Sequence, residues 1–441
     1  MSEASQWKPT SASLADRIDT ASATSFHRLL FLILLGAVVA DAMANSVLGV
    51  VLAPLAGEFQ LSNTLAGALA SVKFAGMALG GSVAGLVSDR LGRRPVFGAS
   101  MVVWGAAALV TSVSHSLPLL IGSLFIGGFG MGAELPIAVT LLLELLPARG
   151  RGRHAAWLQA GAPASTALVA AIALVLMPVF GWRSLYAVLT VLAVGTFLIR
   201  RTVPESPRWH LARGELTKAR EVLRRLSPGD SGSSTGGMQA ELARPVRYRE
   251  LFIRRYRRAT LMTFGSWFCM MTATYGIVTW AAKILVDRGI SITASLTVVL
   301  GISIAGIAGS LCGGSIDRWG RKPVIVAAAL ITAPCCLLYG DTSDQFSAML
   351  AGAAMNFCGN IAAAGLYAYT PELFPTHIRA AGAGIGFGAG RCGAIIGPMV
   401  VPVMLALTTT GPVFAIFGGG FVLAAVLVAL LGTETRGNLT D

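Results

Sequence analysis

Twelve apolar segments, each close to the length that crosses a lipid bilayer, constrain this chain most strongly. A helical span needs about 20 mostly apolar residues, and lipid offers its backbone no hydrogen-bonding partner outside the helix. The chain of 441 residues is 54% hydrophobic and 12% charged, whereas a soluble domain carries about 25% charged residues. The sequence therefore predicts an all-α membrane protein and excludes a soluble enzyme or a disordered chain. The segments are predicted to begin near Leu29, Asn63, Val96, Pro118, Ala155, Ser184, Ala259, Ile292, Val324, Ser347, Ala380 and Pro412.

The basic residues predict how the chain is oriented. Residues 200–258 contain 15 Lys and Arg against 6 Asp and Glu, which is +9 of the net charge of +13. Cytoplasmic loops are enriched in Lys and Arg, so we place this linker and both termini in the cytoplasm, with the spans in the plasma membrane. The same rule accounts for the basic charge, so we expect no nucleic-acid partner. Residues 208–225 have the spacing of one amphipathic helix lying on the membrane surface.

An internal repeat at an offset of 228 residues relates the two halves of the chain. GLVSDRLGRRP (85–95) matches GGSIDRWGRKP (313–323), and E-x-x-P-x-x-x-R recurs at 144–151 and 372–379. Six helices per half, with both ends on one side, predict two parallel bundles and a substrate site between them near the midplane. The expected parts are an N-terminal tail (1–26), a six-helix bundle (27–200), a linker (201–257), a second six-helix bundle (258–433) and a C-terminal tail (434–441).

These repeated motifs resemble the signature of the major facilitator superfamily. The strings GFGMGAELP (128–136), PESPRW (204–209), YAYTPELFPTHIRAAG (367–382) and GRCGAIIGP (390–398) are similar to those of bacterial aromatic-acid, niacin and related metabolite–proton symporters. Synaptic-vesicle-type and sugar-type transporters share parts of them. The resemblance implies twelve transmembrane helices in two pseudo-symmetric six-helix bundles and transport by alternating access.

The resemblance also implies charge networks that gate the cytoplasmic face. The acid and the arginine of each turn motif would pair with partner charges that follow the fourth and tenth spans. Plain anchoring by positive charge, together with turn chemistry, is the alternative, although anchoring needs no acid at matched positions. The residues expected in these networks are Asp89, Arg93, Glu144, Arg151, Asp317, Arg321, Glu372 and Arg379.

Four charged residues lie within spans, where charges are costly unless they are paired or functional. Asp41, Lys73, Glu134 and Arg391 lie about 15–20 Å from one end of their spans, at 1.5 Å per residue. We expect Arg391 to bind a substrate carboxylate, because guanidinium binds carboxylate in a planar, bidentate manner. Permanent pairing of Arg391 with an acid is the alternative.

The other three charges have two interpretations each. Asp41 is the leading proton carrier, since low dielectric favours the protonated form of a carboxyl group; its alternative is a fixed salt bridge to Lys73. Glu134 either carries a proton or stabilises a bend beside Pro136. Lys73 either attracts an anion or neutralises Asp41.

Further polar and aromatic side chains are candidates for the cavity wall. Aromatic residues in spans also serve as packing or as an interface belt, and amides also form helix–helix hydrogen bonds. Two positions depart from the family pattern: Leu124 stands where the resemblance implies an arginine, and Asn45 where it implies a second acid. The candidates are Asn45, Gln159, Trp267, Tyr275, Asn356, Asn360 and Tyr367.

The sequence as a whole favours a monomeric secondary transporter that takes up a small organic anion, such as a nicotinate- or benzoate-like acid, with protons. The alternatives are a proton-coupled drug or metabolite efflux antiporter, a sugar-type porter, and a membrane sensor on the same scaffold. The sequence has no phosphate-binding loop, no H-E-x-x-H site, and no cysteine with metal-ligand spacing to histidine. We therefore expect no enzyme activity, no cofactor and no metal.

Overall fold

The computed structural model describes residues 25–132, 134, 137, 151–200, 204–226, 248–313, 319–342, 344–375 and 378–435. Their long helices in the first half are α2 (Ser25–Glu58), α3 (Asn63–Leu91), α4 (Arg93–Ser112), α5 (Leu117–Gly132), α7 (Arg151–Phe180) and α8 (Arg183–Arg200). Those in the second half are α11 (Arg257–Asp287), α12 (Ile292–Cys312), α13 (Arg321–Asp341), α14 (Gln345–Glu372), α15 (Arg379–Leu405) and α16 (Thr410–Leu431). Between the halves lie α9 (Pro207–Ala212), α10 (Leu216–Leu226) and the 3₁₀ helix η1 (Tyr248–Phe252).

Each predicted apolar segment coincides with one of the long helices, and the starts agree within four residues. Within the described residues, ten of these helices have the length and hydropathy of a membrane span, and α5 and α8 are shorter apolar helices. The prediction of an all-α membrane protein is therefore confirmed.

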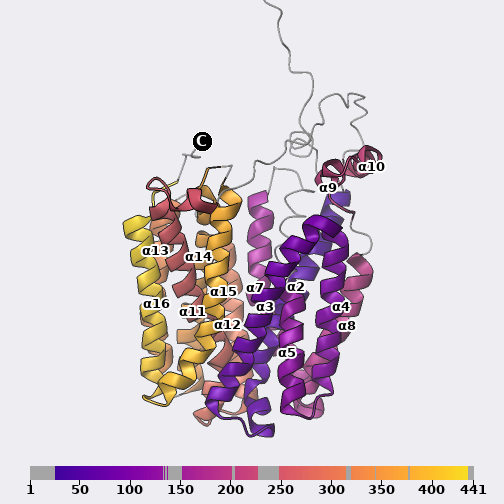
Figure 1. The fold of residues 1–441 in the computed structure, drawn as a ribbon. Helices are drawn as coiled ribbons and strands as arrows, with labels where there is room; N and C mark the ends of the chain where they lie inside the picture. The colour runs from indigo at the N-terminus through magenta and orange to yellow at the C-terminus, as the bar shows by residue number, and fades with distance from the viewer. Residues whose placement is uncertain are drawn as a thin grey trace, which may run out of the picture.

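The helices form two groups that follow the repeat (Figure 1). The first six long helices pack on one another, as do the last six, and the groups meet where α7 packs on α12, α3 on α15 and α2 on α11. We call the groups the N-bundle and the C-bundle. The end that carries α9, α10 and the C-terminal residues is the linker end, and the other is the opposite end. Because α3 and α15 pack together, residues in the middle of these helices meet at the bundle interface.

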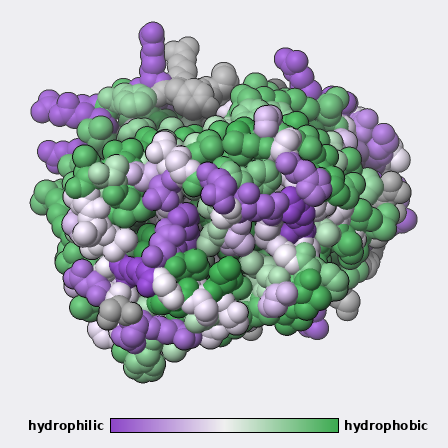
Figure 2. Space-filling view, turned by 90° about the horizontal axis from the view of Figure 1, so that it is seen from below, coloured by the Kyte–Doolittle hydropathy of each residue, from purple (hydrophilic) through white to green (hydrophobic). Residues whose placement is uncertain are grey.

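An arginine closes each bundle at the opposite end. In the N-bundle, Arg183 forms an ion pair with Glu58 at 2.7 Å, and its Nη2 donates to the Ser114 carbonyl at 2.7 Å. In the C-bundle, Arg288 Nη1 donates to the Thr342 carbonyl at 2.7 Å. Ser114 and Thr342 are separated by the repeat offset of 228 residues. Figure 2 shows this face, where hydrophilic residues gather across the middle and hydrophobic residues surround them.

The linker departs from the prediction of a single surface helix over 208–225. It forms two short helices, because Gly214 adopts a left-handed conformation (φ 75°) between α9 and α10. At this turn His210 Nδ1 lies 2.7 Å from Glu215 Oε2, and this hydrogen bond lowers the pKa of Glu215. Val222 of α10 packs in a hydrophobic cluster with Leu30 and Leu34 of α2, so the linker helices lie on the N-bundle.

The two bundles touch through backbone in the half nearer the opposite end. A Cβ on Gly67 would lie 2.7 Å from the Pro398 carbonyl oxygen, and one on Gly49 would lie 2.7 Å from the Val278 carbonyl oxygen. Pro402 has no N–H to bond the carbonyl four residues earlier; the indole of Trp280 donates to that Pro398 oxygen instead, at 3.0 Å. These small residues permit a close approach that side chains would prevent.

Candidate functional site

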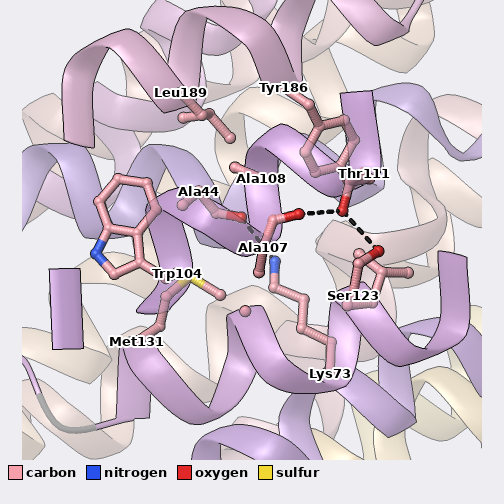
Figure 3. A pocket seen from close by; sticks show the side chains of 12 residues that line it. Ala44, Lys73, Trp104, Ala107, Ala108, Thr111, Ser123, Met131, Tyr186 and Leu189 are labelled. Carbon is pink, nitrogen blue, oxygen red and sulfur yellow. Dashed lines mark hydrogen bonds between the residues drawn. The ribbon is translucent and has the colours of Figure 1, made fainter. Parts of the chain in front are cut away.

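Lys73 is buried inside the N-bundle and is held by carbonyl groups of α2. Its side chain is 2% exposed. Nζ donates to the carbonyl of Ala44 at 2.7 Å (Figure 3) and to that of Asn45 at 2.8 Å. Asp41 precedes these two residues by one helical turn, on the same face of α2, and its charge attracts the ammonium. The two charges predicted at mid-depth on the first two spans therefore act on each other.

Glu134 is bound by Trp104, which lines the same cavity as Lys73. Glu134 is 2% exposed, and Trp104 Nε1 donates to Glu134 Oε1 at 3.1 Å. Trp104 and Lys73 both line a cavity of about 20 Å³ between α2, α3, α4, α5 and α8 (Figure 3). Such a volume holds about one water molecule.

Leu124 lies in the wall of this cavity beside Lys73. The family resemblance implies an arginine at position 124, so the apolar side chain leaves the cavity without that cation. The Lys73 side chain, from the neighbouring helix α3, brings an ammonium to the same cavity. The apolar residue at position 124 and the ammonium of Lys73 thus meet at one cavity.

Arg391 lies at the bundle interface and faces the N-bundle. Its Nη1 is 3.8 Å from Met77 Sδ on α3, and Met77 follows Lys73 by one helical turn. Met77 supplies the one hydrogen-bond contact that the described residues make with this guanidinium. No acid among the described residues forms an ion pair with Arg391, so permanent pairing with an acid finds no support there.

Aromatic rings surround the part of the C-bundle that carries Arg391. The ring of Trp267 lies edge-on to Tyr367 at 4.4 Å and to Phe387 at 5.1 Å, and Tyr367 lies 5.5 Å from Phe387, all between ring centroids. Across the interface, Phe74 of α3 contacts Tyr275 at 4.7 Å. Trp267 Nε1 donates to Thr370 Oγ1 at 2.9 Å, so its polar edge is already used. The aromatic rings thus offer a mainly apolar wall.

Phe387 was not among the predicted wall residues. It precedes Arg391 by four residues on α15, so the two side chains share one face of the helix. That spacing was the signal in the sequence that could have identified it.

The two predicted asparagines form hydrogen bonds between and within helices. Asn356 Nδ2 donates to the Ile302 carbonyl of α12 at 2.9 Å, and Asn360 Nδ2 donates to Asn356 Oδ1 at 2.8 Å. Ser310 Oγ of α12 donates to Asn360 Oδ1 at 3.3 Å. These contacts agree with the alternative of helix–helix bonding, and a role in the cavity wall stays a prediction. The side chain of Gln159 lies outside the described residues.

A family model described as "sugar (and other) transporter" matches residues 19–440, nearly the whole chain. The chain belongs to this family of major facilitator transporters.

Two bacterial relatives match the transporter over nearly its full length. It is 30% identical to the niacin transporter NiaP of Acinetobacter baylyi, over 97% of this chain and 99% of that protein. It is 31% identical to the putative niacin/nicotinamide transporter NiaP of Bacillus subtilis, over 90% of this chain and 93% of the relative. The structure of the Escherichia coli xylose transporter XylE in a partially occluded, inward-open conformation matches with a TM-score of 0.75 at 20% identity, covering 94% of this chain and 100% of that one. That likeness supports the twelve-helix major facilitator fold.

In this transporter, one predicted gating pair is formed within the C-bundle. Arg321 Nε donates to Glu372 Oε2 at 2.5 Å, and Thr435 Oγ1 donates to the same oxygen at 2.7 Å. Arg379 Nε donates to the Phe374 carbonyl at 3.3 Å. Asp317 and Glu144 lie outside the described residues, as do the side chains of Asp89 and Arg151.

Two glutamates that the sequence analysis missed cap matched helices at the linker end. Glu205 accepts hydrogen bonds from the backbone N–H groups of Arg93 at 3.1 Å and Arg94 at 3.0 Å, at the start of α4. Glu434 accepts from those of Arg321 at 3.1 Å and Lys322 at 3.2 Å, at the start of α13. A carboxylate at a helix N-terminus satisfies backbone donors and interacts favourably with the helix dipole. The signal in the sequence was a glutamate that follows the last span of each half within five residues: Glu205 after α8 and Glu434 after α16.

Proposed function

We propose that this transporter carries a small aromatic monocarboxylate, of the nicotinate or benzoate type, across the plasma membrane together with protons. Arg391 carries the proposal: a guanidinium in the middle of α15, at the bundle interface, for which the described residues supply a thioether and no acid. An anion would compensate the charge of a guanidinium in such a place. A substrate carboxylate would supply it.

The neighbouring side chains favour an aromatic acid. Phe387 lies one turn from Arg391 on α15, and its ring contacts that of Tyr367 on α14. Across the bundle interface, the ring of Tyr275 contacts that of Phe74. Aromatic rings bind one another through edge and offset contacts at centroid distances of 4.5–7 Å. Niacin, which both relatives' names print, the second together with nicotinamide, is a pyridine carboxylate, which combines a flat ring with one anionic group.

A sugar substrate, the alternative from the family description, is less favoured. A sugar binds through hydroxyl groups that need free amides and indoles as partners. Here the amides of Asn356 and Asn360 and the indole of Trp267 already hold hydrogen bonds within the C-bundle. A drug or metabolite antiporter for cations is also less favoured, because Arg391 would repel its cargo.

We place the linker end in the cytoplasm, because the basic linker and the basic turns lie there. In this orientation the backbone contacts of Gly49 and Gly67 lie on the periplasmic side of the site. Alternating access would then separate these contacts while closing the linker end. We expect the monomer to be the working unit, since each chain contains both bundles.

Uptake into proteoliposomes tests the proposal. Labelled nicotinate and benzoate are added to vesicles that contain the purified full-length protein, with and without an inward proton gradient. We expect accumulation that a protonophore abolishes, and no comparable uptake of neutral nicotinamide. Protein-free vesicles measure the unaided diffusion of the protonated acids. If the folded protein transports neither acid, the proposed cargo is wrong.

A further inference from the structure

Five exposed arginines gather where the chain enters the first helix of the C-bundle. With one acid, Glu250, they give residues 249–258 a net charge of +4. None of the five forms an ion pair with another residue that the structure describes. We call residues 249–258 the arginine segment. Its arginines are Arg249, Arg254, Arg255, Arg257 and Arg258, all with exposed side chains.

The backbone of the arginine segment is fixed to the C-bundle. Leu251 is fully buried in the hydrophobic core, and Thr260 Oγ1 of α11 donates to the Leu251 carbonyl at 2.7 Å. The N–H of Arg257 donates to the Ile253 carbonyl at 2.9 Å, and η1 packs on both α11 and α15. The arginine side chains therefore extend from a fixed part of the protein surface.

Large apolar side chains are exposed beside these arginines. Phe252 is 62% exposed and Ile253 is 47% exposed, and both directly precede the membrane-spanning helix α11. Apolar surface of this kind is unfavourable in water and favourable in contact with lipid. Basic residues next to exposed apolar residues are typical of a segment that lies at the level of the lipid headgroups.

Arg257 lies at the end of an apolar stripe on α11. Leu261 and Phe264 follow it by four and seven residues and are 58% and 49% exposed, so the three side chains share one face of the helix. The ring of Phe268 stacks on that of Phe264 at 6.4 Å between centroids. On a helix long and apolar enough to cross a membrane, exposed apolar side chains contact acyl chains. Arg257, about 6 Å along the axis from Leu261, then lies near the headgroups.

The chemistry of these side chains matches an anionic phospholipid. Guanidinium groups bind phosphate oxygens in a planar, bidentate manner, and basic residues near an anionic membrane surface are attracted to it. A lipid with a net negative charge satisfies the arginines through its headgroup and the apolar stripe through its acyl chains. A zwitterionic lipid lacks the net charge, and a soluble anion lacks the acyl chains.

We infer that the arginine segment binds anionic phospholipids of the leaflet at the linker end, with lipid phosphates on the arginines and acyl chains along Phe252, Leu261 and Phe264. Such binding goes beyond the proposed function, and it depends neither on the cargo nor on which side of the membrane the linker end faces. It anchors the start of the C-bundle at the membrane surface, whereas α9 and α10 lie on the N-bundle.

Native mass spectrometry of the purified full-length protein tests this inference. The protein in detergent is titrated with equimolar phosphatidylglycerol and phosphatidylcholine that have the same acyl chains, and the retained lipids are identified. We expect the wild-type protein to retain phosphatidylglycerol in preference to phosphatidylcholine. Equal retention of the two lipids would overturn the inference.

A triple variant with a charge-matched control locates the binding. Arg254→Gln/Arg255→Gln/Arg257→Gln removes three positive charges from the arginine segment, and we expect its affinity for phosphatidylglycerol to be at least about tenfold lower. Lys218→Gln/Arg220→Gln/Arg224→Gln removes three from exposed positions on α10 and should retain the wild-type affinity. Wild-type affinity in the first variant, or equal weakening in both, would refute binding at the arginine segment.

Glycerol 1-phosphate separates a lipid site from a site for a soluble anion, because it carries the phosphate without acyl chains. We expect it to leave phosphatidylglycerol bound at an equal concentration, and displacement there would show that the site binds soluble anions. Thermal unfolding without added lipid checks that each variant is folded. If the triple variant is not, Arg254→Gln and Arg255→Gln, which precede α11, are measured singly, and wild-type affinity in both would overturn the inference.

Discussion

The guanidinium of Arg391 on α15 lies 3.8 Å from the sulfur of Met77 on α3, across the interface between the two bundles. This contact brings the positive charge of the C-bundle within about two helical turns of Lys73, on the N-bundle helix that carries Met77. The mid-membrane charges therefore lie on both sides of one interface, where alternating access changes their separation.

Asp41→Asn should abolish accumulation driven by a proton gradient and leave exchange of labelled for unlabelled nicotinate measurable. The substitution replaces the ionisable carboxyl group proposed to carry the proton with an amide that does not titrate, so no proton is carried at this position. Gradient-driven uptake and exchange are measured in the same vesicles. Asp341→Asn, at the exposed end of α13, is the control. Undiminished accumulation by Asp41→Asn would exclude Asp41 from the coupling.

Isophthalate should compete with nicotinate at least about tenfold more weakly than benzoate does. It adds a second carboxylate to the same ring, and the interior offers one arginine, so the second charge would be buried without a partner. Inhibition of nicotinate uptake by each acid gives the comparison. Equal inhibition by the two acids would mean that the site accepts a dianion.

Glu434→Ala should destabilise the C-bundle by about 0.5–2 kcal/mol, as expected for the loss of a helix cap. The carboxylate accepts hydrogen bonds from two backbone N–H groups at the start of α13. Glu205→Ala should have a similar effect through α4. Thermal unfolding of the purified protein checks both variants. An unchanged unfolding temperature in both would show that these carboxylates contribute no net stability.

Gly67→Ala should lower the maximal rate of nicotinate uptake several-fold with little change in KM. The added methyl group would lie 2.7 Å from the Pro398 carbonyl oxygen and 3.0 Å from Pro402 Cγ, so α3 and α15 could no longer approach fully at the opposite end. Gly57→Ala is the matched control, because a Cβ on Gly57 meets no atom within 4 Å. Equal rates for the two variants would show that this close approach is not needed for transport.

The sequence predicted the parts of the fold that repeat or that follow hydropathy. The twelve segments and the 228-residue offset gave the helices and their two groups. The offset also links Ser114 with Thr342, whose carbonyls accept hydrogen bonds from Arg183 and Arg288. The single helix predicted over 208–225 was wrong, because the left-handed conformation of Gly214 interrupts it.

The site was less predictable, because its organisation depends on contacts between distant segments. Sequence position placed four charges at one depth, but not the carbonyls of Ala44 and Asn45 that hold Lys73, nor the indole of Trp104 that binds Glu134. The amides of Asn356 and Asn360 could equally face a substrate or a helix, and their hydrogen bonds became visible only once α12 and α14 were packed together.

Equilibrium binding of labelled nicotinate to the purified protein tests the central claim, the recognition of a carboxylate by Arg391, most directly. The wild-type protein is compared with Arg391→Ala and Arg391→Lys, and thermal unfolding confirms that each variant is folded. A charged hydrogen-bonded pair contributes about 1.5–3 kcal/mol, so we predict affinity lower by about 10- to 100-fold for Arg391→Ala. Arg391→Lys should fall between the two, since it keeps the charge and loses the bidentate geometry. Wild-type affinity for nicotinate in a folded Arg391→Ala variant would contradict the account.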